Sequence, residues 1–124
     1  PGGRNFNPAL VAANPWVFSA FEDLGHVYAR LAAAGTLRDA SYDAAYAIFA
    51  GVVVNAPRDT AGWWRAKEGV LRVLFERGKP GDFEAAKLGM ADLRGNNPDF
   101  DGNRFGMKAK LEALEKRLGE KEPK

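Results

Sequence analysis

The sequence predicts an all-α fold of about two helix-turn-helix hairpins followed by a C-terminal capping helix. Three observations predict it. Long Ala-rich runs contain no Pro, which suits helices. Apolar residues recur at three- and four-residue spacing. Pro15, Pro57 and Pro98 punctuate the chain at intervals of 42 and 41 residues. With 124 residues, the chain is long enough for one domain with a modest core.

The first hairpin is predicted over residues 16–57. Its first helix runs from Trp16 to Ala34 and ends at Gly35, a typical C-terminal cap. The second helix is predicted over Tyr42–Val54, with Asp39 or Ser41 as its N-cap. This helix is apolar nearly all round, so we expect it to pack between neighbours. The residues expected to face the core from the first helix are Val17, Phe21, Leu24, Val27 or Tyr28, and Leu31.

The second hairpin is predicted over residues 58–98. Its first helix is capped by Asp59 or Thr60, carries the amphipathic run Trp63–Phe75 and ends near Arg77. Its second helix, Phe83–Arg94, is expected to have Asp82 as its cap. A fifth helix over about 103–118 is apolar on one face and polar on the other, so we expect it to cap the array. The predicted inward residues of the last two helices are Phe83, Ala86, Met90, Leu93, Phe105, Met107, Leu111, Leu114 and Leu118.

The predicted helical domain covers residues 15–119, between an irregular segment over 1–14 and a charged tail over 120–124. The chain begins Pro1-Gly2-Gly3 without Met, so we expect a processed chain or a piece of a longer one. The longest apolar run, Ala44–Val54, is too short to span a bilayer, and we expect a soluble protein. The compartment stays open between cytoplasmic and periplasmic or exported.

The two hairpins align as an internal repeat. At an offset of 41 residues, Tyr42 matches Phe83, and the same offset relates Ala45 to Ala86, Phe49 to Met90 and Pro57 to Pro98. The preceding helices match at an offset of 43, which relates Phe21 to Trp64 and Leu31 to Leu74. The two-residue difference lies in the inter-helix turns. A change of length confined to a turn is what a helical-hairpin repeat tolerates.

These residues resemble the tetratricopeptide repeat. The first unit reads Phe21-x2-Leu24-Gly25-x2-Tyr28, then Ala45-x3-Phe49 and a closing Pro57. The second unit is looser, because Lys67 and Glu68 replace the Leu-Gly pair. The units are 41–42 residues long, whereas those of the family have about 34, so other two-helix solenoid repeats stay open. The resemblance implies a right-handed α-α superhelix whose concave face binds a peptide or a partner protein.

If the hairpins stack as in that family, charged residues of the first helices line the concave face. We expect a net basic partner-binding surface there, suited to an acidic or carboxylate-ended ligand. The lysine and asparagine clamp of some family members is missing, because Glu22 and His26 occupy two of its positions. The predicted surface residues are Glu22, His26, Arg30, Arg65, Arg72 and Lys110.

Trp63 is a further candidate for partner binding. It is adjacent to Trp64, and neighbouring residues on a helix point 100° apart, so one core cannot easily take both rings. An exposed Trp63 would be a binding anchor, because Trp is enriched at interface hot spots. The alternative is that Trp63 packs on the neighbouring turn or on the N-terminal segment.

The sequence contains few residues suited to catalysis or to metal binding. The chain has no Cys and one His, His26, and its four Ser/Thr hydroxyls offer no triad, so we expect neither an enzyme nor a cofactor or metal site. Asp99–Asn103 begins like a calcium loop, but Arg104 and Lys110 stand at its sixth and twelfth positions. The 18 basic and 16 acidic residues are intermixed, which argues against nucleic-acid binding. The alternative to a binding module is a structural helical domain, packed in a larger assembly or beside a catalytic domain.

Overall fold

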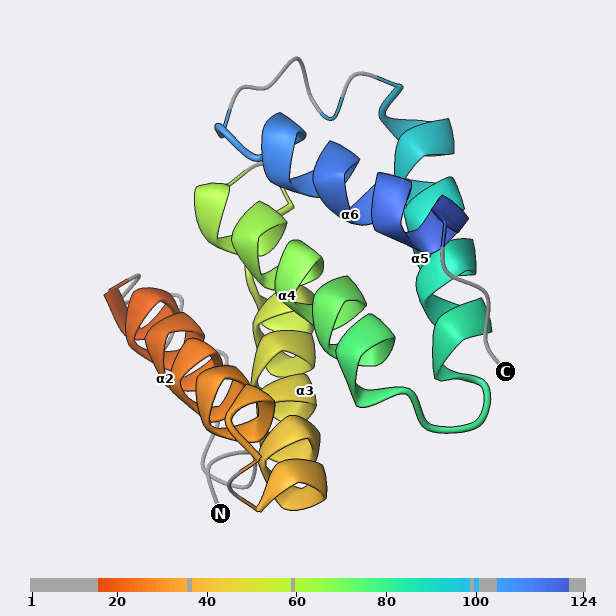
Figure 1. Cartoon of the computed structure of the whole chain (residues 1–124). Coiled ribbons are helices and arrows are strands. Elements are labelled where there is room, and N and C mark those ends of the chain that lie inside the picture. Colours follow the sequence, from red (N-terminus) through yellow and green to blue (C-terminus); the bar gives the residue numbers. More distant parts are fainter. Residues whose placement is uncertain (1–15, 36, 59, 99, 101–104, 121–124) are drawn as a thin grey trace. The chain divides into compact units, whose positions relative to one another are not determined.

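The computed structural model describes residues 16–35, 37–58, 60–98, 100 and 105–120, with side chains from Ala20 onward. These residues form helices and no strand, which confirms the all-α prediction (Figure 1). The chain forms two compact units, Pro1–Val70 and Leu71–Lys124. The predicted segment 1–14 and tail residues 121–124 lie outside the described residues. The helices are α2 (Trp16–Ala33), α3 (Arg38–Asn55), α4 (Ala61–Arg77), α5 (Asp82–Asn96) and α6 (Lys108–Glu120).

In the first unit, α2 and α3 form an antiparallel hairpin (Figure 1). Gly35 ends α2 as predicted: its φ is +86° and its N–H donates to the carbonyl of Ala32 at 2.9 Å. The predicted caps of α3 are wrong, because the helix already begins at Arg38 and no side chain caps it. Leu37 precedes α3 in the left-handed region, with φ of 43°.

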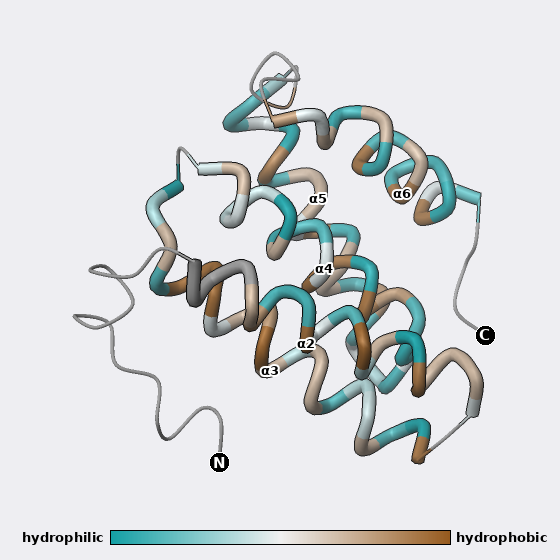
Figure 2. The backbone as a smooth tube through the Cα atoms, turned by 90° about the vertical axis from the view of Figure 1, so that its left-hand side faces the viewer, coloured by the Kyte–Doolittle hydropathy of each residue, from teal (hydrophilic) through white to brown (hydrophobic). Residues whose placement is uncertain are grey.

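The core face of α2 differs from the prediction. Leu24, Val27 and Leu31 are 43%, 41% and 40% exposed, whereas the buried positions of this helix are small or acidic: Glu22, Gly25, Ala29 and Ala32. Small residues allow a helix to approach its neighbour closely, and this close approach turns the larger apolar side chains outward. Hydrophobic positions recur along both α2 and α3 (Figure 2), and α3 buries Tyr42, Phe49 and Val52.

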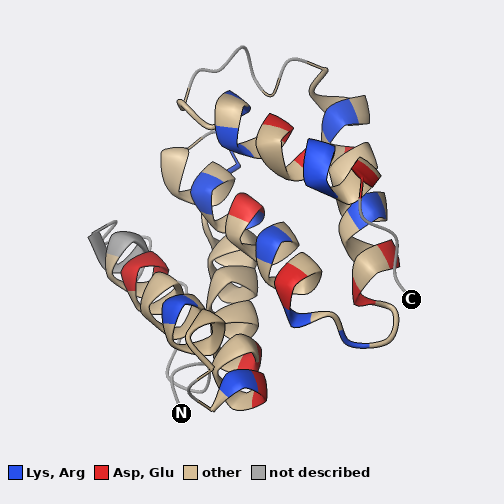
Figure 3. Cartoon of the chain, in the orientation of Figure 1, with Lys and Arg blue, Asp and Glu red and all other residues tan. Residues whose placement is uncertain are grey.

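α3 supplies the centre of the first unit. Its charged residues are confined to its first two turns, and the rest of the helix carries none (Figure 3). Phe49 is completely buried, and its ring lies against glycines of both neighbouring helices. A Cβ atom at Gly25 of α2 would sit 2.9 Å from this ring, and one at Gly69 of α4 would sit 2.8 Å from it. The two glycines therefore make room for one aromatic ring.

Gly69→Ala should lower stability, although alanine is the better helix former by about 1 kcal/mol. The added methyl would overlap a fully buried ring, and overpacking of this kind costs about 1–3 kcal/mol. Gly51→Ala on α3 is the matched control, since its Cβ would meet nothing within 4 Å, and it should gain up to about 1 kcal/mol. Urea unfolding followed by circular dichroism measures both changes. Equal shifts of the same sign would contradict this account of Gly69.

The second unit buries the apolar faces predicted for its helices. Ala86, Met90 and Leu93 of α5 are buried, as are Met107 and, on α6, Leu111, Leu114 and Leu118, while Phe83 and Phe105 are half-buried. α6 packs against α5, and Arg94 of α5 bonds to Glu115 of α6 at 2.6 Å. α6 begins at Lys108, later than predicted, because residues 105–107 form a turn in which Gly106 has a φ of +70°.

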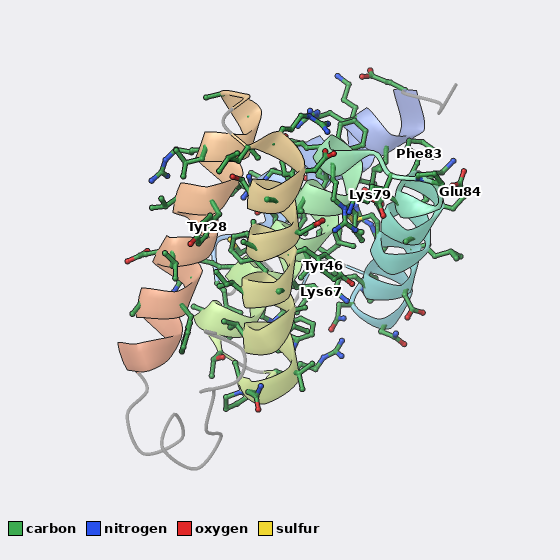
Figure 4. All side chains as sticks on the ribbon, turned by 90° about the horizontal axis from the view of Figure 1, so that it is seen from below. Tyr28, Tyr46, Lys67, Lys79, Phe83 and Glu84 are labelled. Atoms are coloured by element: carbon green, nitrogen blue, oxygen red, sulfur yellow. The ribbon has the colours of Figure 1, made fainter. Side chains whose placement is uncertain are left out.

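A buried ion pair closes the turn between α4 and α5. Arg77 donates from Nε to Asp82 Oδ2 at 2.8 Å and from Nη2 to Oδ1 at 3.1 Å. The backbone N–H of Lys79 donates to the same carboxylate at 3.0 Å. Asp82 is thus the first residue of α5 and joins its start to the end of α4; it is not the side-chain cap that was predicted. Lys79, Phe83 and Glu84 are labelled at this turn in Figure 4.

Candidate interaction site

Three of the predicted partner-binding residues meet in the first unit. Glu22 and His26 lie one turn apart on α2, and Arg65 reaches them from α4. The Nε atom of Arg65 donates to both carboxylate oxygens of Glu22 at 2.8 Å. His26 Nε2 lies 3.5 Å from Glu22 Oε2. The result is one carboxylate held between an arginine and an imidazole.

The three side chains differ in their exposure. The side chain of Glu22 is 7% exposed, whereas those of His26 and Arg65 are 29% and 39% exposed. Burial alone would raise the pKa of Glu22, but the hydrogen bonds from His26 and Arg65, together with their charges, lower this pKa below its ordinary value. Glu22 is therefore an ionised internal partner, and the groups available to a ligand are cationic or imidazole.

His26 also contacts the aromatic core. The His26 and Phe49 rings meet edge to face, with centroids 5.0 Å apart and an interplanar angle of 69°. Phe49 is fixed in turn between Gly25 and Gly69. The position of His26 at the surface is thus set by the core beneath it.

The other three predicted surface residues lie farther along α2 or belong to the second unit. Arg30 is exposed one turn beyond His26 along α2. Arg72, which is half-buried on α4, and Lys110, which is exposed on α6, belong to the second unit. The structure therefore groups Glu22, His26 and Arg65, and the full basic surface stays a prediction.

The expectation of an exposed Trp63 is wrong. Trp63 is 7% exposed and Trp64 only 2%. Arg58, from the chain before α4, stacks over the Trp63 ring at 4.8 Å, and the Trp64 ring meets it edge to face at 5.3 Å. Arg58 and Trp64 thus contact a ring that sequence periodicity alone places away from the core. Packing on the N-terminal segment, the other alternative considered for Trp63, lies outside the described residues.

The described residues offer little for metal or membrane chemistry. Among them, no group of three His, Asp or Glu side chains is placed to hold a metal ion. The segment from Asp99 to Asn103, which begins like a calcium loop, lies outside the described residues except for Phe100. Within the part of the chain that is described, no helix combines the length and the hydropathy needed to cross a bilayer.

Comparisons with protein-family models, with curated proteins and with solved structures find no match to this chain.

Proposed function

We propose that this chain is a tetratricopeptide-like helical-repeat module that binds a protein or peptide through the surface carrying His26 and Arg65. One observation carries the proposal. The Arg65–Glu22 contact joins residues 43 positions apart, and 43 is also the offset that aligns the first helices of the two predicted repeats. In stacked helical hairpins, each repeat contacts its neighbour, and equivalent positions of successive first helices can meet. The Glu22–Arg65 contact is therefore consistent with stacked hairpins.

The exposed groups of the cluster favour a carboxylate ligand. Arg65 bonds to Glu22 through Nε, and a guanidinium carries four further N–H groups on its two Nη atoms. Planar arginine donors match a carboxylate well. The ligand class is therefore a peptide or protein segment that presents an acidic side chain or a free C-terminal carboxylate.

A library of random peptides with free C-termini, displayed and selected on the full chain, tests this proposal. Selected peptides are then measured by fluorescence anisotropy against the double variant Glu22→Gln/Arg65→Gln. This variant leaves the net charge unchanged and avoids an uncompensated buried carboxylate, because both members of the pair become neutral. We expect its affinity to fall about tenfold or more, as for loss of a charge-assisted bond.

Lys116→Gln/Glu120→Gln, at two exposed positions of α6, also removes one charge of each sign; it is the matched control and should bind as the wild type does. Circular dichroism checks that both variants keep their helices. Unchanged affinity in the Glu22→Gln/Arg65→Gln variant would rule out the proposed ligand class. Selected peptides that lack acidic side chains and bind equally well when their C-terminus is amidated would also rule it out.

A structural domain within a larger assembly is the second candidate. The observation that favours it is the exposure of large apolar side chains: Leu24, Val27, Leu31, Leu37, Val54 and Leu88. In an assembly, partner surfaces would cover them. A purified chain that stays monodisperse at high concentration and binds no 8-anilinonaphthalene-1-sulfonate would contradict this candidate.

A further inference from the structure

α2 presents an apolar stripe on its exposed face. Leu24, Val27 and Leu31 follow one another at spacings of three and four residues, and each is at least 40% exposed. Ala20, on the same face, is also exposed. This spacing is that of a seam along which one helix packs on another. Glu22 lies on the opposite, buried face of α2, so the stripe is separate from the Glu22–Arg65 cluster.

Two opposite charges border the stripe on one side. Asp23 and Arg30 are both exposed and lie seven residues apart, which is two turns of helix. Among the described residues, neither side chain makes an ion pair. Asp23 immediately precedes Leu24, and Arg30 immediately precedes Leu31. The stripe therefore carries a negative charge at one end and a positive charge at the other.

We propose that α2 pairs with α2 of a second copy of this chain, antiparallel about a two-fold axis near Val27. Antiparallel pairing reverses the residue order, so Leu24 of each copy meets Leu31 of the other. The same rotation brings Asp23 of each copy to Arg30 of the other, which gives two ion pairs on one side of the helix pair. A parallel two-fold pair would instead put the charged residues of the two copies on opposite sides of the interface, where neither ion pair can form. The charge pattern thus favours a second copy of this chain as the partner of α2, and an antiparallel arrangement of the two helices.

The expected dimer is weak and concentration-dependent. An α2 helix of 18 residues is about 27 Å long, and a pair of such helices makes an interface at the small end of the range for specific complexes. Its residues are not those of the proposed ligand site, so self-association and peptide binding are tested independently.

The lack of cysteine makes the pairing directly testable. Val27→Cys places a thiol at the two-fold axis, where the same residue of the second copy lies within reach of a disulfide. Mild oxidation of the dilute full chain should convert most of this variant to a covalent dimer. Val54→Cys, at an 80% exposed position of α3, is the matched control and should stay largely monomeric. Equal cross-linking of the two variants, or none at Val27→Cys, would overturn the proposal.

Charge reversal tests the direction of the pairing. Sedimentation equilibrium should show the wild type passing from 13.5 kDa towards twice that mass as its concentration rises. Asp23→Lys or Arg30→Glu alone should weaken the dimer about tenfold, because each change sets two like-charge contacts in place of two ion pairs. The double variant Asp23→Lys/Arg30→Glu should restore the wild-type affinity. A chain that is monomeric throughout, or a double variant that dimerises no more tightly than the single variants, would overturn the proposed pairing.

Discussion

Phe49→Ala is expected to be the most destabilising single substitution in the first unit, at about 3–5 kcal/mol. The ring is completely buried and contacts two neighbouring helices: Gly25 and His26 on α2, and Gly69 on α4. Its removal leaves a cavity that the two glycines cannot fill, since neither has a side chain to move into it. Urea unfolding, followed by circular dichroism, measures the loss.

Two further measurements test whether the loss of stability comes from the packing of this ring on the glycines or only from the apolar area removed. Phe83→Ala removes a half-buried phenylalanine of the second unit and should cost clearly less. Gly69→Ala should be better tolerated when combined with Phe49→Leu than alone, because the smaller side chain makes room for the methyl. Additive effects of Gly69→Ala and Phe49→Leu would contradict direct packing of the ring on the glycine.

Asp82→Ala is expected to destabilise the second unit by about 2–3 kcal/mol. The side chains of Arg77 and Asp82 are 12% and 10% exposed, and removal of one member of a buried pair leaves the other charge without its compensation. The turn also loses the bond from the Lys79 N–H. Asp39→Ala is the control, because its pair with Arg38 is exposed and should contribute less than about 0.5 kcal/mol. Similar losses for the two variants would contradict the role given to burial.

The Arg77–Asp82 pair should also depend on pH. Burial alone would raise the pKa of Asp82, but the hydrogen bonds from Arg77 and the Lys79 N–H, with their charges, hold this pKa below its ordinary value of 3.8. A carboxyl group with a lowered folded-state pKa stabilises the fold above its unfolded pKa, and this contribution is lost as the pH falls through the folded pKa. The free-energy difference between wild type and Asp82→Asn should therefore be constant near neutral pH and shrink below about pH 4. A difference independent of pH would contradict the ionised pair.

The sequence predicts the helices and most of their core faces because large apolar residues mark them. Phe49 and Val52 on α3, and Leu111 and Leu114 on α6, are buried where periodicity places them. α2 breaks the rule, since its buried face is made of small residues and Glu22, while its leucines are exposed. Hydrophobic periodicity assigns the large apolar residues of a helix to its core face. It cannot show that a ring from α3 occupies the space beside Gly25.

The sequence predicted which residues form the candidate site better than it predicted what each of them does. Register placed Glu22, His26 and Arg65 on one surface, and the structure brings them into contact. Sequence spacing could not show that Glu22 is buried and neutralises Arg65, because this depends on the approach of α2 to α4. The offset of 43 between the two residues is the one signal that could have suggested the pair. Trp63 was misjudged because the contact with Arg58 comes from an irregular segment.

The Glu22–Arg65 contact bears on how such a chain could have arisen. If the two hairpins descend from one duplicated hairpin, the residues now at positions 22 and 65 were once identical. Two copies of either residue at this contact would have set like charges about 3 Å apart at a buried site, which is strongly unfavourable. Divergence at this point would then have been an early requirement of joining the copies. The Glu22–Arg65 pair would then mark the point at which the two hairpins became different in sequence, so that neither could replace the other in the fold.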